Sequence, residues 1–111
     1  MHNWIKEFPS AITVCNTEGT IIEMNNESAE TFKKDGGSNL IGQSLIDCHP
    51  EPSKSKLKDM LKTHSKNVYT IEKNGKKKLI FQSPWFKNGK YMGFVEISQE
   101  IPFEMPHFIR D

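Results

Sequence analysis

The chain has 111 residues, 35% of them hydrophobic, and its 15 lysine and arginine residues against 14 aspartate and glutamate residues give a formal net charge of +1. A chain of this length buries about two-thirds of the surface that its unfolded form exposes, which suffices for one hydrophobic core. It contains no apolar run near the roughly 20 residues of a membrane span, no recognisable secretory signal, and only two separate cysteines. We therefore expect one cytoplasmic domain, and we exclude large multidomain enzymes, membrane proteins and disulfide miniproteins.

Charge is unevenly distributed along the sequence. Residues 53–90 contain eleven lysines and two acidic residues, a local net charge of +9, whereas residues 1–52 and 91–111 carry −5 and −3. Such a distribution can steer an acidic partner, although a solvated helix face and a hairpin tip are its ordinary interpretation. Aromatic residues that could stack bases do not alternate with these lysines, so we do not expect a nucleic-acid partner.

The N-terminal part is predicted to form a β-hairpin followed by a helix. Two short β-branched runs, residues 11–15 and 20–24, flank Asn16-Thr17-Glu18-Gly19, in which Asn and Gly favour a turn. Asn25 and its neighbour can then cap a helix through residues 27–32. The next segments are short and predict single helical turns packed on the core.

The one clearly amphipathic helix is predicted from Ser53, as its N-cap, to about Ser65. Its apolar stripe recurs at the spacing of one helix face, and most of its lysines lie off that stripe. One face of this helix is therefore expected to be buried. The stripe consists of Leu57, Met60, Leu61 and His64.

Three strands are predicted in the C-terminal half, at residues 67–73, 77–86 and 90–99. They are joined by Asn74-Gly75 and Asn88-Gly89, which are strong signals for two-residue hairpin turns. Two strands, several helices and three further strands indicate an α+β domain. We expect a five-stranded antiparallel sheet with short helices and one longer helix on one face.

This arrangement resembles a PAS domain. Residues 12–25 are similar to the opening hairpin of that family, Leu40-Ile41-Gly42 to its short Leu-Ile-Gly signature, and residues 89–101 to its closing strand. The resemblance covers residues 9–101 and implies a sensory or interaction domain with helices over one sheet face. Residues 1–8 are then an N-terminal cap segment, and residues 102–111 a C-terminal tail.

The segment Asp47-Cys48-His49-Pro50 is similar to a Cys-His-Pro variant of PAS domains associated with hemerythrin-like proteins. Adjacent Cys48 and His49 side chains point in different directions, so a metal would need ligands from elsewhere, such as His64 or Cys15. We expect no metal, and we interpret Cys48 as structural or pocket-lining.

The sequence does not name a cofactor. The resemblance implies a histidine near His64 in haem-binding PAS domains, but the spacing to the next hairpin departs from theirs, and a single histidine on an apolar stripe is usually structural. In light-sensing flavin domains the reactive cysteine would fall near Leu45, three residues before Cys48. That departure excludes a flavin photoadduct and leaves a non-covalently bound flavin open.

Alternation along the last strand predicts which of its residues face the helices. Gly93 permits a close backbone approach, so we place it inward, on the same face as Tyr91, Val95 and Ile97. The outward set is then Met92, Phe94 and Glu96.

On the neighbouring strand, the resemblance places Ile80 and Gln82 inward and Phe81, Ser83 and Trp85 outward. Gln82 is notable because a buried amide must find hydrogen-bond partners. Those partners are either a ligand head group or water, or a neighbouring side chain in a filled core.

The outward set predicts an apolar outer sheet face, which is rarely left bare. PAS domains commonly dimerise or dock helices there, and the N-terminal segment with Ile5 is too short to cover it alone. Residues 105–109 can fold back against this face, and we expect a homodimer or a separate signalling protein to complete the cover. The predicted interface residues are Trp4, Phe8, Phe81, Trp85, Met92 and Phe94.

Two functions fit these expectations. The first is a sensory PAS module that binds a small molecule in its core and acts in trans, because about 90 residues of PAS fold leave no room for an output domain. The alternative is a ligand-free interaction or dimerisation domain with a filled core. No nucleophile elbow, phosphate-binding glycine loop or zinc-protease motif is present, so we do not expect an enzyme. The predicted ligand-binding residues are Cys48, Leu57, Leu61, His64, Ile80, Gln82, Gly93 and Val95.

Overall fold

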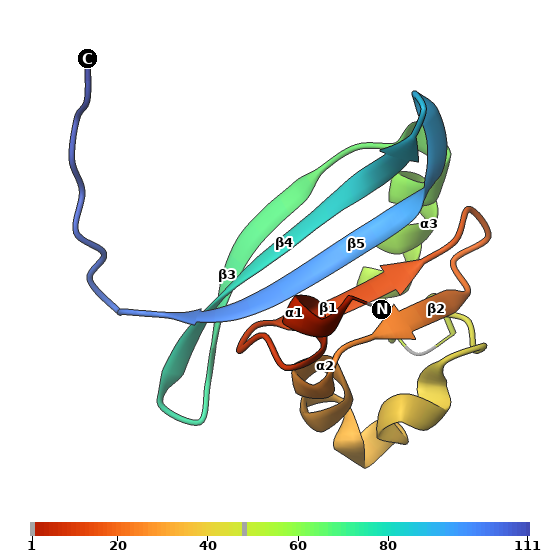
Figure 1. The fold of residues 1–111 in the computed structure, drawn as a ribbon, viewed down its shortest axis with the longest axis horizontal. Coiled ribbons are helices and arrows are strands. Elements are labelled where there is room, and N and C mark those ends of the chain that lie inside the picture. Colours follow the sequence, from red (N-terminus) through yellow and green to blue (C-terminus); the bar gives the residue numbers. More distant parts are fainter. Residues whose placement is uncertain (1, 48) are drawn as a thin grey trace.

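The chain folds into a five-stranded antiparallel sheet with its longer helix packed on one face, as predicted (Figure 1). The computed structural model describes residues 2–47 and 49–111. The strands are arranged in the order β2-β1-β5-β4-β3, so the first and last strands of the chain are neighbours at the centre. The elements are α1 (Asn3–Lys6), β1 (Ala11–Cys15), β2 (Ile21–Met24), α2 (Asn26–Thr31), α3 (Ser53–Thr63), β3 (Asn67–Lys73), β4 (Lys76–Lys87) and β5 (Lys90–Ile101), with short 3-10 helices at Lys33–Asp35 and Gly37–Leu40.

The two Asn-Gly turns join β3, β4 and β5 into a long meander. Asn74 and Gly75 have φ values of 54° and 75°, and Asn88 and Gly89 have values of 52° and 79°. Positive φ at both central residues is the geometry whose twist matches that of the flanking strands, and Asn and Gly tolerate it best. The predicted hairpins are therefore confirmed.

Asn25 ties the N-terminal hairpin to α2 and to the segment that precedes β1. The Oδ1 atom of Asn25 accepts hydrogen bonds from the backbone N–H groups of Ile12 at 2.9 Å and Ser28 at 3.0 Å. Its Nδ2 atom donates to the carbonyl oxygens of Ser10 at 2.8 Å and Ile5 at 3.1 Å. The side chain is only 1% exposed. The predicted helix cap is thus confirmed, and the same amide also anchors α1.

The start of α3 differs from the prediction. Ser53 is already the first helical residue, and Pro52 occupies the N-cap position without a side-chain cap. Glu51 supplies the missing acceptor, because its carboxylate accepts hydrogen bonds of 2.8 Å from the backbone N–H and the hydroxyl of Ser55. These bonds lower the pKa of Glu51. At the other end, His64 terminates the helix in the left-handed conformation, with φ 57°.

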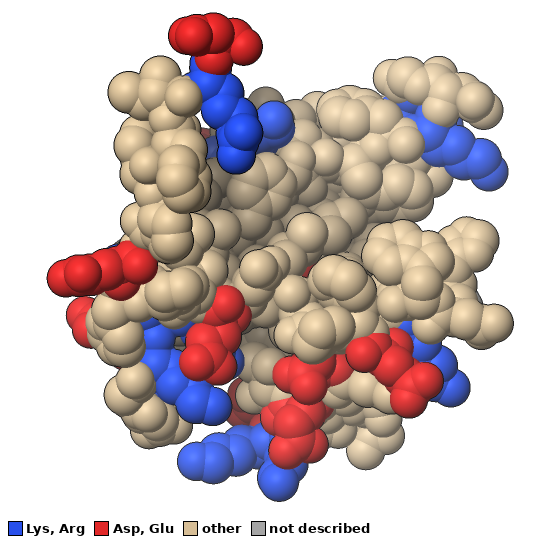
Figure 2. All heavy atoms as spheres, turned by 60° about the vertical axis from the view of Figure 1, so that its left-hand side comes forward, with Lys and Arg blue, Asp and Glu red and all other residues tan. Residues whose placement is uncertain are grey.

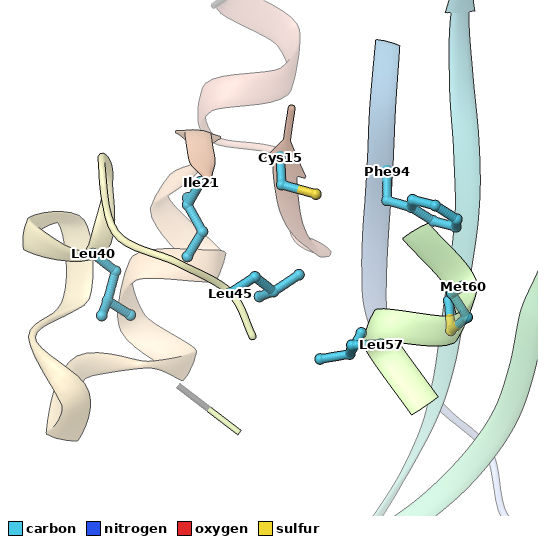
Figure 3. Packing of buried hydrophobic residues seen from close by; sticks show 7 residues of the cluster. All are labelled: Cys15, Ile21, Leu40, Leu45, Leu57, Met60 and Phe94. Carbon is cyan, nitrogen blue, oxygen red and sulfur yellow. The ribbon is translucent and has the colours of Figure 1, made fainter. Parts of the chain in front are cut away.

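The hydrophobic core lies between the sheet and its helical cover. In Figure 3, Phe94 from β5 lies on the same side as Leu57 and Met60 from α3, and Leu45 lies between this group and Ile21. The core therefore joins residues from the beginning, middle and end of the chain. Its buried members are Cys15, Ile21, Leu40, Leu45, Leu57, Met60 and Phe94.

The predicted orientation of β5 is wrong over most of its length. Phe94 is buried in the core cluster, and Glu96 borders a cavity on the same face. Their neighbours Val95 and Ile97 alternate with them, so these two side chains belong to the opposite face. Phe94 is consequently not an outer-face interface residue.

A β-bulge explains why alternation failed. Trp85 pairs with Gly93, but the next residue, Phe86, pairs with Tyr91, so Met92 is an extra residue in β5. An extra residue shifts the alternation of side chains by one position. Tyr91 therefore packs against the core, as predicted, while every residue after the bulge changes face.

The C-terminal tail does not fold back on the sheet as predicted. Residues 102–111 project away from the body of the molecule (Figure 1). Phe108 and Ile109 are 71% and 89% exposed, and Phe103 and Met105 are exposed as well. The N-terminal segment does form a short helix, but Trp4 and Phe8 remain exposed.

Gly93 is required where β5 passes the end of β1. A Cβ atom at Gly93 would overlap the carbonyl oxygen of Cys15, and its φ of 136° is one that other residues rarely adopt. Trp85, its partner on β4, donates a hydrogen bond of 3.2 Å from its indole N–H to the same carbonyl oxygen. The close approach predicted from this glycine is confirmed, but the approaching group is the backbone of β1 and not a helix.

Replacing Gly93 by alanine tests this requirement. We expect Gly93→Ala to lower the free energy of unfolding by about 3 kcal/mol or more, because β1 and β5 must separate to admit the methyl group. Gly75→Ala is the control, since Gly75 also has positive φ but an open surrounding, and about 1 kcal/mol is expected there. Urea denaturation followed by tryptophan fluorescence measures both, and equal losses would contradict the steric argument.

Candidate functional site

A row of polar side chains crosses the inner face of the sheet. Asn67 on β3, Gln82 on β4 and Glu96 on β5 are register partners. The Nδ2 atom of Asn67 donates to Oε1 of Gln82 at 3.0 Å, and the Nε2 atom of Gln82 donates to Oε1 of Glu96 at 3.2 Å. Thr13 on β1 is the register partner of Glu96 and shares a 2.5 Å hydrogen bond with the hydroxyl of Ser28. The row thus runs from the β3 edge of the sheet to α2.

Glu96 is the ionisable group of this row. Removal of its carboxylate from water raises the pKa of Glu96 above the ordinary carboxyl value. The hydrogen bond from Gln82 and the nearby His49 act in the opposite direction and reduce this rise. Removing a charged carboxylate from water lowers the stability of the folded state.

A small cavity lies beside Glu96. Its volume is about 20 Å³, which corresponds to room for about one water molecule. Apart from Glu96, Gln82 and Thr13, its walls are apolar, and they come from β1, β4, β5, α3 and the segment before α3. The lining residues are Thr13, Cys15, Leu45, Leu57, Met60, Leu61, Gln82, Phe94, Val95 and Glu96.

A wider cleft of about 390 Å³ lies between the start of α3 and the β3 edge. Leu57 and Gln82 belong to the walls of both the cavity and the cleft, so the two spaces lie side by side. A volume of this size falls within the range of small-molecule sites. The cleft is lined by His49, Pro52, Ser53, Lys56, Leu57, Asn67, Tyr69 and Gln82.

A third hollow, of about 200 Å³, lies on the side of α2 and shares Thr13 and Leu45 with the cavity. His49 borders both this hollow and the cleft. The Nδ1 atom of His49 lies 2.8 Å from the carbonyl oxygen of Leu45, which fixes the ring between them. The polar row therefore has open space on both sides of a nearly filled centre.

The predicted ligand-binding residues are only partly brought together. Leu57, Leu61 and Gln82 border the cavity, and Gln82 is 6% exposed on the inner face, as predicted. Val95 also borders the cavity, although its side chain belongs to the opposite face of the sheet. Ile80 is also buried and inward, one register step away. Gly93 lies against β1, His64 lies outside these spaces, and Cys48 lies outside the described residues.

His64 does not face the cavity. It is exposed at the end of α3, and its ring stacks on Tyr91 with 3.6 Å between ring centroids and 17° between ring planes. The residues present therefore do not fit haem, because the cavity has room for about one water molecule and His64, the residue compared with the histidine of haem-binding PAS domains, stacks on Tyr91. The same filled centre does not fit an isoalloxazine ring.

Sequence reasoning missed four residues of the site, namely Glu96, His49, Asn67 and Tyr69. Glu96 was placed on the outer face because the bulge at Met92 was not recognised. An acidic residue within the apolar run Phe94-Val95-Glu96-Ile97 was a usable signal, since acids are rarely buried without a reason. Asn67 and Tyr69 lie on the same face of β3, and His49 comes from the segment before α3, so only the folded chain brings the three to one cleft.

Other candidate sites are less developed. Within residues 2–47 and 49–111, no group of three or more histidine, cysteine, aspartate or glutamate side chains could hold a metal ion. The helices in this part of the chain are all too short or too polar to cross a membrane.

The basic segment of the sequence is partly neutralised in space. On the face shown in Figure 2, acidic and basic side chains gather together near the lower edge, and much of the centre carries neither. Lysines of the β3–β4 hairpin share a hollow of about 410 Å³ with acids of α2, and Lys76 lies 3.7 Å from Glu100. The hollow therefore has mixed charge and does not form a uniform basic surface. Its charged residues are Glu27, Glu30, Lys33, Lys34, Lys73, Lys76, Lys78 and Glu100.

Solved structures share this architecture at low sequence identity. A C-terminal domain from Streptococcus mutans superposes with a TM-score of 0.69 at 19% identity, over 86% of this chain and 78% of that chain. The Aer2 receptor of Vibrio cholerae, described as a dual PAS-heme oxygen sensor, gives 0.61 at 13% identity, over 84% and 95%. VqmA of the same organism, described as a dimer, gives 0.64 at 12% identity, over 90% and 51%.

Sequence comparison identifies the family. No curated protein matches the chain. A family model for the PAS fold matches residues 5–102, which is nearly the whole chain, and the resemblance seen in the sequence is thereby confirmed. The chain belongs to the family of PAS-fold domains.

Proposed function

We propose that this chain is a sensory module that binds a small molecule on the inner face of its sheet and responds by changing its association with another protein. It acts as a binding module and not as an enzyme. The observation that carries the proposal is the carboxylate of Glu96, which borders the cavity and accepts a hydrogen bond from Gln82, a residue that lines both the cavity and the cleft. Carboxyl groups whose pKa is raised by removal from water cluster at functional sites.

The geometry supports a ligand that lies mainly in the cleft. The cleft of about 390 Å³ has the size of a small-molecule site, whereas the central cavity admits a single small group. Asn67 and Gln82 present a fixed hydrogen-bonded edge between the two spaces. A ligand there would contact α3, β3 and β4 together.

Association is proposed to use the outer face of the sheet. Phe81, Trp85, Val95 and Ile97 alternate with the inner residues of β4 and β5 and leave an apolar surface. Trp4 and Phe8 add an exposed aromatic pair, with ring centroids 6.0 Å apart. The partner is a second copy or a separate signalling protein, and the dimeric VqmA supports the former.

The second candidate is a ligand-free interaction domain. It is favoured by the central cavity, which at about 20 Å³ is nearly filled. Under this candidate, Gln82 serves only to satisfy Asn67 and Glu96 within the core. Both candidate functions use the outer face of the sheet for association. They differ in whether a ligand binds on the inner face.

Native mass spectrometry of the purified chain tests for a ligand. We expect a co-purified small molecule on the wild type and its loss from Ser53→Trp, because an indole at Ser53 fills the cleft from its rim. Lys58→Trp is the matched control, since Lys58 is exposed on α3 and borders none of the spaces described above. A wild-type chain without any bound mass would favour the ligand-free candidate.

The effect of the Glu96 carboxylate on the stability of the folded chain can be measured as a function of pH. Because burial raises the pKa of Glu96 in the folded state, the folded chain binds this proton more tightly than the unfolded chain does. Stability from this group is therefore present at acidic pH and is lost as pH rises through the folded-state pKa. We expect Glu96→Gln to raise Tm by a few degrees at neutral pH and to lose that advantage near about pH 4.

Thermal denaturation of the ligand-free proteins between about pH 4 and pH 8 makes this measurement. Glu100→Gln is the control, because Glu100 lies on the same strand but is exposed and paired with Lys76. A Tm difference for Glu96→Gln that does not vary with pH would show that the carboxylate costs nothing.

Substitution on the outer face tests association. We expect the wild type to form dimers or larger species and Phe81→Glu to be monomeric, because a carboxylate on the apolar face must be desolvated on contact. Ile41→Glu is the control, since Ile41 is exposed but lies in the segment beyond the helix Gly37–Leu40. Light scattering after size-exclusion chromatography measures the mass. A wild type that is monomeric up to high concentration would leave only a different protein as partner.

A further inference from the structure

The chemistry around Glu96 identifies the class of ligand, and this step rests on the proposed function. The cavity beside Glu96 combines one carboxylate with walls from Cys15, Leu45 and Phe94, which carry no positive charge. The donor available to the carboxylate from its own row is the Gln82 amide, whose oxygen is already engaged by Asn67. His49 and Tyr69 also lie near this carboxylate, but Gln82 is the neighbour that donates a hydrogen bond to it. A partly buried carboxylate with one neutral hydrogen-bond donor favours an incoming cation.

The size of the cavity limits which cation can enter. Room for about one water molecule also suits a primary ammonium group, which has a similar size and three hydrogen-bond donors. A quaternary ammonium or a guanidinium group is too large for a space of about 20 Å³. An anionic head group would bring like charges together beside Glu96.

The cleft limits the size and polarity of the rest of the ligand. Leu57 and Gln82 line both the cleft and the cavity, so a ligand with its head group beside Glu96 extends into the cleft by displacing the side chain of Leu57. Pro52 and the ring of Tyr69 offer apolar contact for a body of modest size. Lys56 also borders the cleft, but it is exposed, so water screens its charge from the ligand.

We propose that the site binds a small primary amine with an apolar or aromatic body, its ammonium group beside Glu96 and its body in the cleft. The ammonium group replaces the water that Glu96 lost on folding. Gln82 holds the carboxylate in place, and Asn67 holds Gln82. The selectivity of the site for amines therefore resides in Glu96.

Isothermal titration calorimetry with three matched probes tests this assignment on the full chain at neutral pH. The probes are 2-phenylethylamine, the neutral 2-phenylethanol, and the trimethylated ammonium analogue of the amine. We expect the primary amine to bind about tenfold or more tightly than either of the others, because only it combines the charge with a small head group. Equal affinity for the amine and the alcohol would overturn the proposal.

Two variants locate the selectivity. Glu96→Gln has nearly the same shape and is expected to remain folded, and it should reduce the preference for amine over alcohol to about onefold. Glu100→Gln, on the same strand and exposed, should keep the preference. A preference that survives Glu96→Gln would overturn the assignment to Glu96, and circular dichroism confirms that both variants are folded.

Failure of this inference is distinguishable from failure of the proposed function. If the alcohol binds as well as the amine, or if mass spectrometry finds a bound molecule without an amine, the ligand class is wrong and small-molecule binding stands. If none of the three probes binds and the wild type carries no bound mass, both proposals are overturned.

Discussion

The pairing of β1 with β5 is the interaction on which the rest of the structure depends. Residues 11–15 pair with residues 94–98, so strands from the two ends of the chain are neighbours at the centre of the sheet. Bringing such distant segments together carries a loop-closure cost, which the hydrogen bonds of the pairing and the core beneath it must offset. Gly93 permits the approach, because any side chain there would overlap the backbone of β1. The pairing also places Thr13 beside Glu96 and Cys15 beside Phe94, and thereby builds one wall of the candidate site.

The row of polar side chains on the inner face of the sheet lowers the stability of the fold. Asn67 and Gln82 satisfy each other, and Gln82 satisfies one oxygen of Glu96, so the amides cost little. The carboxylate still has to leave water, which is why the pKa of Glu96 is raised. Apolar residues of similar volume in place of buried charged groups often make a protein more stable. Residues that lower the stability of a fold tend to cluster at functional sites. This is the physical reason for placing the candidate site at Glu96.

Local sequence signals predicted most of the fold and less of the site. The Asn-Gly turns and the Asn25 cap depend on neighbouring residues only, so propensity and turn chemistry sufficed for them. The orientation of β5 depends on the bulge at Met92, which arises from how β5 meets β4 and β1, and no residue of β5 signals it alone. The side chain of Gln82 was correctly predicted to face inward. Its hydrogen-bond partners could not be predicted, because they depend on the register of β3, β4 and β5. The cleft is formed by His49, α3 and β3, and such tertiary proximity has no local signature.

The two faces of β4 and β5 are connected by the strands themselves. Phe81 and Gln82 are adjacent residues with side chains on opposite faces, and Glu96 and Ile97 are related in the same way. A group that binds beside Glu96 and shifts β5 must therefore also shift the outer apolar surface. Close packing limits how far such a displacement can be absorbed locally. A ligand changes association only to the extent that it binds the associated and free states with different affinity. An ammonium group beside Glu96 provides such a difference if the position of β5 differs between the two states, because its interaction with the carboxylate depends strongly on distance in an enclosed site.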